Sequence, residues 1–199
     1  MAVQFSVSKN LLLYGEIVIG KSTLIKRALE NCTGEFGGFL TVRRQLPGGC
    51  PSFFLLPGQA MKNAALEEVG QAFLDLTDGV LLRNEVFASY GVRLLADTPS
   101  YPFALMDEFG GVELLVPAFR VALQAVLDSP VPCLGVFKTY RAGQTLAETL
   151  SLSEEYAQIY SEWKNRLEAD PDTRLVPVLK KGDETAMAVI REWVSRYAE

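Results

Sequence analysis

One short motif constrains the fold of this chain more than any other feature of its sequence. It lies within Asn10–Thr23 and matches G-x-x-x-x-G-K-[ST] in full. Its fixed positions are occupied by Gly15, Gly20, Lys21 and Ser22. The apolar run Leu11–Tyr14 before the motif predicts a buried parallel strand, and the periodicity of Thr23–Asn31 after it predicts a helix. A strand, a loop and a helix in this order form the context in which this motif cradles phosphate groups.

The loop between the two glycines has a direct chemical interpretation. Successive backbone N–H groups would point inward at a phosphate chain, and the start of the helix adds further N–H groups. Lys21 is predicted to reach the β- and γ-phosphates, and the Ser22 hydroxyl is predicted to hold Mg²⁺. The alternative is a strand–helix turn that binds nothing, but such a turn has no need for Lys-Ser after its second glycine. The predicted nucleotide-binding residues are Gly15, Glu16, Ile17, Val18, Ile19, Gly20, Lys21, Ser22 and Thr23.

The middle of the loop carries three β-branched residues, Ile17, Val18 and Ile19. β-branched side chains resist positive φ angles. If the loop needs a positive φ at Val18, the backbone is strained there, or the loop takes another shape. This run is the main argument from the residues against tight nucleotide binding.

The composition bounds the class of protein. With 199 residues, 49% of them hydrophobic and 22% charged, the chain is typical of one globular domain, predicted to span residues 1–199. The net charge of −5 argues against broad nucleic-acid binding, which needs a basic face. The absence of histidine excludes His-based zinc sites and Ser-His-Asp catalysis, and three distant cysteines suggest neither disulfides nor a metal cluster. Because the sequence contains no signal peptide pattern and no membrane-spanning run, we expect a cytoplasmic location.

Strands and helices alternate along the rest of the chain. Residues 39–44 and 52–56 predict a strand hairpin, and residues 64–76 have helical spacing interrupted by Gly70; the region of about 39–82 is interpreted as a hairpin and helical insertion. The alternation predicts an α/β fold, with a mostly parallel sheet that helices cover on both faces. Further strands are predicted at 103–107, 131–137 and 175–179, and further helices at 84–96, 116–128, 151–168 and 183–197.

Three of these helices begin with capping patterns. Asn84 and Asp183 are predicted N-caps, and Ser151–Glu154 resembles a capping box. The helix that follows Ser151–Glu154 is predicted to bury one face. That face collects Tyr156, Ile159, Tyr160, Trp163 and Leu167.

A site that hydrolyses nucleotides needs a second part, an apolar strand that ends in an acidic residue. Phe103–Asp107 provides this strand, and Glu108 follows directly. Asp107 is predicted to bind Mg²⁺ beside the loop, and Glu108 is predicted to orient and polarise an attacking water. The alternative is an acidic pair that closes a strand and caps the turn before Gly110.

Other candidates carry weaker signals. Arg43 and Arg44 end a strand and could stabilise charge on a transferred phosphoryl group, although arginines at strand ends are often surface residues. Lys138 and Thr139 approach the γ-phosphate if their strand lies next to the strand of the loop. The remaining candidates are Tyr90 and Arg141 beside a base or ribose, and Glu113 as a carboxylate behind the Asp-Glu turn.

Several segments of the chain occur together in a known order. In sequence they are G-E-I-V-I-G-K-S-T-L, G-G-F-L-T-V-R-R, E-V-F-A-S-Y-G-V, M-D-E-F-G-G-V-E-L and P-V-P-C-L-G-V-F-K. This series resembles the cancer-related nucleoside-triphosphatase family, small P-loop proteins that are also labelled predicted nucleotide kinases. The resemblance covers about two-thirds of the chain, Leu11 to Lys138. Its most specific part is D-E-x-G-x-x-E, matched by Asp107, Glu108, Gly110 and Glu113.

The resemblance implies a RecA/AAA-like parallel sheet and Mg²⁺-dependent hydrolysis of nucleoside triphosphates, such as ATP or GTP, with broad base tolerance. It implies that Glu108 activates water, and it supports roles for Arg43 and Glu113. The chain departs from the family pattern at Val18, where a glycine is usual, and this departure bears on affinity. It departs again at Lys181–Glu184, in place of an Asn-Arg-Asp-like stretch, and this departure bears on base contacts or C-terminal packing.

Three functions are compatible with this sequence. The first is a Mg²⁺-dependent nucleoside triphosphatase in which Lys21, Arg43 and Glu108 are the catalytic residues. The second is a nucleotide or small-molecule kinase, which needs an acceptor pocket; only the region 59–82 is long enough to hold one, and the sequence shows no arginine-rich lid. The third is a non-catalytic nucleotide-binding module with a degenerate loop.

Overall fold

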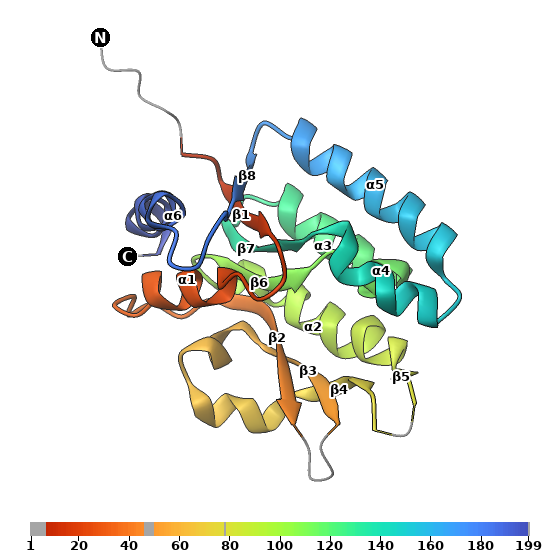
Figure 1. Ribbon diagram of the computed structural model, residues 1–199. Helices are drawn as coiled ribbons and strands as arrows, with labels where there is room; N and C mark the ends of the chain where they lie inside the picture. Colours follow the sequence, from red (N-terminus) through yellow and green to blue (C-terminus); the bar gives the residue numbers. More distant parts are fainter. Residues whose placement is uncertain (1–6, 46–49, 78, 199) are drawn as a thin grey trace.

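The computed structural model describes residues 7–45, 50–77 and 79–198. The described strands form an eight-stranded sheet in the order β5-β4-β3-β2-β6-β7-β1-β8 (Figure 1). The strands are β1 (Asn10–Gly15), β2 (Gly37–Gln45), β3 (Pro51–Pro57), β4 (Gln71–Asp75), β5 (Leu81–Leu82), β6 (Ala104–Phe109), β7 (Cys133–Lys138) and β8 (Thr173–Pro177). The α-helices are α1 (Lys21–Ala28), α2 (Val92–Ala96), α3 (Pro117–Asp128), α4 (Tyr140–Thr149), α5 (Ser153–Ala169) and α6 (Glu184–Tyr197).

The sheet consists of a parallel part and an antiparallel edge. Strands β2, β6, β7, β1 and β8 pair in parallel, so their carboxyl ends meet at one edge of the sheet. Strands β3, β4 and β5 continue the sheet as antiparallel neighbours. The predicted hairpin is therefore confirmed as β2 and β3, and the region interpreted as an insertion extends the same sheet.

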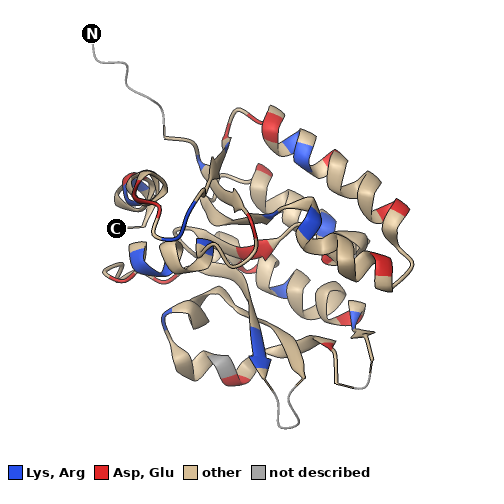
Figure 2. Ribbon diagram, in the orientation of Figure 1, with Lys and Arg blue, Asp and Glu red and all other residues tan. Residues whose placement is uncertain are grey.

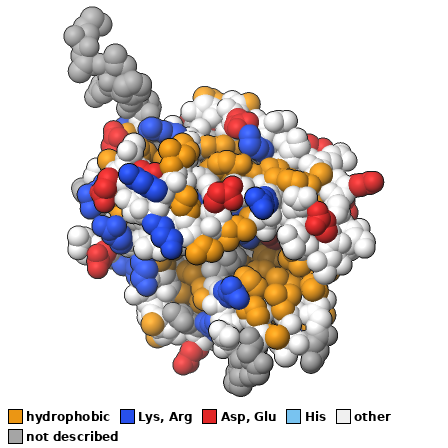
Figure 3. All heavy atoms as spheres, in the orientation of Figure 1, with side chains coloured by type: hydrophobic (Ala, Val, Ile, Leu, Met, Phe, Trp, Pro, Cys, Tyr) orange, Lys and Arg blue, Asp and Glu red, His pale blue; other side chains and the backbone are white. Residues whose placement is uncertain are grey.

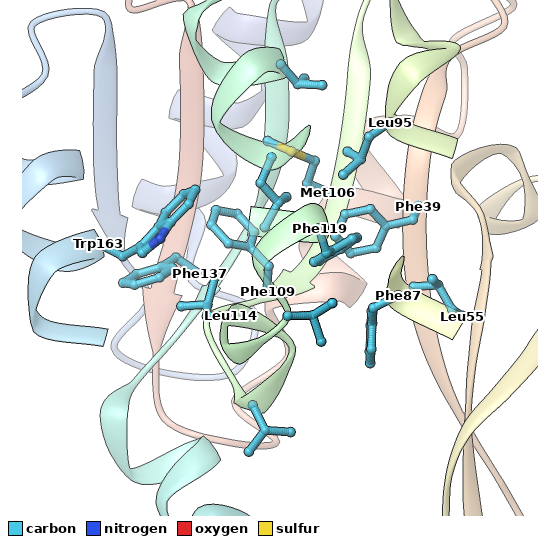
Figure 4. Packing of buried hydrophobic residues seen from close by; sticks show 14 of the residues in the cluster. Phe39, Leu55, Phe87, Leu95, Met106, Phe109, Leu114, Phe119, Phe137 and Trp163 are labelled. Carbon is cyan, nitrogen blue, oxygen red and sulfur yellow. The ribbon is translucent and has the colours of Figure 1, made fainter. Parts of the chain in front are cut away.

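Two apolar layers hold the sheet, because the central strands are buried on both faces. Leu12 of β1 belongs to the layer under α2, α3 and α5, whereas Leu11 and Leu13 belong to the layer under α1 and α6 (Figure 1). In the first layer, Phe39, Phe87 and Phe119 form a chain of tilted ring contacts (Figure 4). The α/β fold with helices on both faces is thus the observed one. No helix within the described residues has the length and apolar character needed to cross a membrane.

Several sequence predictions are confirmed. The strands predicted at 103–107, 131–137 and 175–179 correspond to β6, β7 and β8, and β8 begins two residues before its predicted start. Asp183 caps α6, since its side chain accepts hydrogen bonds from the N–H groups of Thr185 and Ala186. The predicted buried face of α5 is buried in full. Cys32, Cys50 and Cys133 are free thiols.

Other predictions are wrong for identifiable reasons. The helical spacing at 64–76 covers a short 3₁₀ helix, η2 (Ala64–Val69), and then β4, because Gly70 ends the helical segment. Ser151–Glu154 does not form a capping box: the N-cap of α5 is Leu152, and Ser151 has a φ of 58°. The helix predicted from 84 to 96 is, in contrast, confirmed over its whole length, with a π-helical stretch, η3 (Val86–Gly91), before α2.

Candidate functional site

The phosphate loop joins β1 to α1 at the carboxyl edge of the parallel strands. Gly20 is the N-cap of α1 and has a φ of 95°, a conformation that glycine adopts without steric cost. Val18 also has a positive φ, 63°, so the condition set by the sequence is met and the backbone is strained there. Val18 is 77% exposed, so its side chain contributes little packing to the loop.

Lys21 lies buried in the curve of this loop. Its ammonium donates hydrogen bonds to the carbonyl oxygens of Gly15 at 2.9 Å and Glu16 at 2.8 Å. Burial lowers the pKa of this ammonium, while the carboxylates of Glu108 and Asp107 oppose that effect. The Lys21 ammonium is therefore held by carbonyl groups of the loop itself, and its contact with phosphates stays a prediction.

Asp107 reaches the loop although its strand is not the neighbour of β1. Strand β7 lies between β6 and β1, and yet the Ser22 hydroxyl donates a hydrogen bond of 2.9 Å to Asp107 Oδ1. The Asp107 side chain is buried, and burial together with the nearby Glu108 raises the pKa of its carboxyl to about 7. The two predicted metal-binding side chains thus meet in space.

Glu108 belongs to a cluster of charged side chains behind the site. Lys138 Nζ lies 3.9 Å from Glu108 Oε2 and 3.9 Å from Glu113 Oε2. Burial alone would lower the pKa of the Lys138 ammonium, but Glu113 and Glu108 outweigh it and the pKa is raised. Glu113 is buried and accepts a 2.7 Å hydrogen bond from the Gly111 N–H. One ammonium therefore links the two glutamates of the D-E-x-G-x-x-E pattern.

Thr139 follows Lys138 at the end of β7. Because β7 pairs with β1, Lys138 lies opposite Gly15, as required for both residues to approach the phosphate loop. The Thr139 hydroxyl is buried and has no hydrogen-bond partner among the described residues. It does not cap α4, although Thr139 is the N-cap of that helix. A buried hydroxyl without a partner at this position is suited to bind a ligand.

A cavity of about 460 Å³ opens over the start of α1. Four of its lining residues, Leu24, Arg27, Lys181 and Gly182, were not predicted site residues, although the sequence marks Lys181–Glu184 as a departure that bears on base contacts. Arg27 lies one turn after Thr23 on α1, a helical spacing that could have indicated it. Lysine and arginine side chains gather around α1 and the segment before α6 (Figures 2 and 3). The predicted residues that line the cavity are Val18, Gly20, Lys21, Ser22, Thr23 and Glu108.

The remaining candidates lie outside this cavity's lining. Arg43 is exposed on β2, three residues beyond Leu40, which pairs with Asp107. The Arg44 guanidinium lies over the Phe54 ring, 4.6 Å from its centroid. Tyr90 lines a different cavity, of about 420 Å³, and Arg141 is exposed on α4. The expected contact of Tyr90 with a base or ribose therefore has no support from the geometry.

Comparison with known proteins assigns the family. The model of the NTPase family matches residues 10–170. The chain belongs to the NTPase family. This result confirms the resemblance seen in the sequence motifs. It assigns the chain, in general terms, as a P-loop NTPase-like protein that binds nucleotides.

A solved structure supports the fold of this NTPase family member. The crystal structure of THEP1 from the hyperthermophile Aquifex aeolicus matches it with a TM-score of 0.61 and 16% sequence identity. The match covers 96% of this chain and 99% of that one. At this identity the likeness concerns the fold alone. None of the curated proteins matches this chain.

The chemistry of the site fits Mg²⁺. The Ser22 hydroxyl and the Asp107 carboxylate are hard oxygen ligands, and they lie 2.9 Å apart. The described residues contain no cluster of three or more Asp, Glu, His or Cys side chains that could hold a metal ion. A site with few protein ligands is typical of Mg²⁺, which takes its other ligands from phosphate oxygens and water.

Proposed function

We propose that this protein hydrolyses nucleoside triphosphates to the diphosphate and phosphate in a Mg²⁺-dependent reaction. The observation that carries this proposal is the position of Glu108. Glu108 lines the cavity over the phosphate loop and directly follows Asp107, which accepts a hydrogen bond from Ser22. A carboxylate at this position can accept a proton from a water that faces the γ-phosphate.

The residues divide the work of this reaction. The loop N–H groups and Lys21 would bind the β- and γ-phosphates, and Ser22 and Asp107 would hold the metal ion. Bound Mg²⁺ supplies positive charge against the phosphate oxygens. Glu108 accepts a proton from water, and the water oxygen forms a new bond to the γ-phosphorus. The bond between the γ-phosphorus and the bridging oxygen breaks as the diphosphate leaves. Arg43 remains a candidate for stabilising charge on the transferred group.

Two side chains at the end of β7 complete the proposed site. The free Thr139 hydroxyl would hydrogen-bond the γ-phosphate or the attacking water. Lys138 would hold the Glu108 carboxylate in place through the ion pair at 3.9 Å. Glu113 accepts the Gly111 N–H and contacts the same ammonium from the other side.

The position of the second cavity favours hydrolysis over the kinase alternative. A kinase acceptor pocket was expected in the region 59–82, and the 420 Å³ cavity does lie there, lined by Gln59, Leu66 and Gln71. Its wall also contains Gly37 and Gly38, which begin β2. Parallel strands begin at the edge of the sheet opposite the phosphate loop, so an acceptor in this cavity would lie far from the γ-phosphate.

Phosphate release by the purified protein tests this proposal. The assay uses Mg²⁺ with ATP, GTP, CTP or UTP, and it includes Lys21→Ala and Glu108→Gln. We expect turnover with several bases, loss of turnover and binding in Lys21→Ala, and a fall in kcat of about 10²–10⁴ in Glu108→Gln with nucleotide binding retained. Lys26→Ala and Glu30→Gln, at exposed positions on and just after α1, are the matched controls.

Binding without turnover would favour the non-catalytic module. Transfer of the γ-phosphate to a nucleoside monophosphate would favour the kinase. The cytoplasmic location stays a prediction.

A further inference from the structure

The acidic turn is covered by two helices that the active-site motifs do not include. Helices α4 and α5 pack against each other and against the 3₁₀ turn η5 (Val112–Leu115), which directly follows the Asp107–Gly111 segment. From α5, Trp163 contacts the ring of Phe109, with centroids 6.1 Å apart (Figure 4). The residue after Glu108 is therefore held by α5 as well as by its pairing with Phe137 of β7.

Tyr156 of α5 makes the most direct contact with this turn. Its side chain is fully buried, and its hydroxyl lies 3.0 Å from the carbonyl oxygen of Gly110 and 3.1 Å from that of Tyr140. A phenol has one proton to donate, so the two carbonyl groups share it. Burial raises the pKa of this hydroxyl, so it stays protonated, and therefore a donor, at neutral pH. Tyr156 thus ties the acidic turn to the start of α4.

Close packing leaves this contact little freedom. A Cβ atom at Gly143 of α4 would lie 2.3 Å from the Tyr156 hydroxyl oxygen and 3.1 Å from Cα of Gly111. Helix α4 can therefore approach the turn and Tyr156 only because residue 143 is a glycine. The aromatic rings of Tyr140 and Tyr156 stack at 5.3 Å with an interplanar angle of 13°.

A second tyrosine anchors the partner of Glu108 in the same way. The Tyr160 hydroxyl, one turn along α5, donates a 2.9 Å hydrogen bond to the backbone carbonyl of Lys138. Lys138 in turn contacts Glu108 and Glu113. Helix α5 therefore holds both sides of the ion pair, the turn through Tyr156 and the lysine through Tyr160.

From these contacts we infer that Tyr156 is a positioning residue for hydrolysis, which fixes the Gly110 turn so that the Glu108 carboxylate faces the attacking water. The inference rests on the proposed function. Tyr156 itself lies behind the turn and acts through Glu108. Loss of the Tyr156 hydroxyl should therefore slow the chemical step and leave nucleotide binding unchanged, because the phosphate loop belongs to other elements.

The test compares Tyr156→Phe with Tyr197→Phe. Both changes remove one hydroxyl that donates to a backbone carbonyl, and the Tyr197 bond, 3.2 Å to Val7, lies far from the turn. We expect Tyr156→Phe to lower kcat about tenfold, the equivalent of one hydrogen bond, with KM and nucleotide affinity within about twofold of the wild type. Tyr197→Phe should leave kcat unchanged.

A double-mutant cycle separates positioning from general stability. In the Glu108→Gln background, Tyr156→Phe should cause no further loss of kcat, because the group that it positions is gone. The inference would be overturned if the kcat losses of Glu108→Gln and Tyr156→Phe multiplied in the double variant, or if Tyr197→Phe lost as much kcat as Tyr156→Phe. A wild-type protein that turns over while Tyr156→Phe keeps full kcat would refute the inference alone. A wild-type protein without phosphate release would refute the proposed function, and the inference with it.

Discussion

The phosphate loop and the acidic turn face the same cavity but are built in opposite ways. The loop is local: its shape comes from Gly20, Val18 and the start of α1, and its side chains at Ile17 and Val18 are more than half exposed. The acidic turn depends on distant segments, since Lys138 of β7 and Tyr156 of α5 contact it. Substrate binding and catalysis should therefore respond to different substitutions.

The largest loss of folding stability is expected from Lys138→Met, which removes the ammonium that faces two glutamates. Glu113 is buried, and loss of one partner of a buried pair costs about 3–5 kcal/mol. Urea denaturation measures this loss. The matched control is Lys164→Met, which removes a surface pair with Glu168 at 2.5 Å and should cost less than about 0.5 kcal/mol. Adding Glu113→Gln to Lys138→Met should restore part of the stability. Equal losses in the two lysine variants would contradict the comparison.

A pair of glycine substitutions sharpens the same contrast. Gly20 and Gly110 have similar φ angles, 95° and 107°, so alanine meets similar backbone strain, about 1–2 kcal/mol, at both positions. At Gly20 the new Cβ would meet nothing within 4 Å among the described residues, whereas at Gly110 it would lie 2.8 Å from the Phe137 ring. We therefore expect Gly110→Ala to cost about 3 kcal/mol and Gly20→Ala only the strain. Similar losses in denaturation experiments would show that the turn is as loosely packed as the loop.

The same difference explains which parts of the site the sequence predicts. The loop depends on residues close in sequence, so its motif and the positive φ condition at Val18 can be derived from the chain alone. The meeting of Ser22 with Asp107 follows from strand order, which the motifs of β6 and β1 indicate together. Burial of Tyr156 is also predictable from helical spacing, but its hydrogen bond to Gly110 is not, because α4 must first be in place.

The sequence patterns do not predict helix α4. Its buried residues are Gly143 and Ala147, both small, so its buried face lacks the large apolar side chains that mark a helix. Glycine in a helix interior also lowers helix propensity. In the structure Gly143 is needed for the close approach to Gly111, which is a tertiary reason that no local pattern contains.

Asp107 should give a smaller, pH-dependent effect. Its carboxyl has an ordinary pKa of 3.8 and a folded pKa of about 7, so between these values the folded chain holds a proton that the unfolded chain has released. The stability from this proton is fully present below pH 3.8, and it is lost progressively as the pH rises from there to about 7. In the presence of a chelator, the stability of Asp107→Asn relative to the wild type should therefore rise between pH 5 and pH 8 by about 2–3 kcal/mol, or a few degrees in melting temperature. Added Mg²⁺ should raise the melting temperature of the wild type only. A pH-independent difference would contradict the folded pKa.

The smallest effect is expected from Val18→Gly. Glycine relieves the strain of a φ of 63°, but it also gives the unfolded chain more freedom, so the two effects largely cancel. The removed side chain is 77% exposed and contributes little packing. Stability should change by less than about 0.5 kcal/mol, and nucleotide affinity measured by titration calorimetry should rise by no more than about threefold. A rise of several orders of magnitude would mean that Val18 blocks the loop.

Strand β7 gives the molecule a fixed internal spacing. It separates β1, which carries the phosphate loop, from β6, which carries the acidic residues, and its own end carries Lys138 and Thr139. Two strand spacings, about 10 Å in all, therefore set the distance between the two halves. Every backbone hydrogen bond along β7 keeps this distance constant, so changes in the surrounding loops can alter which molecule is held without altering how far the reacting groups stand apart.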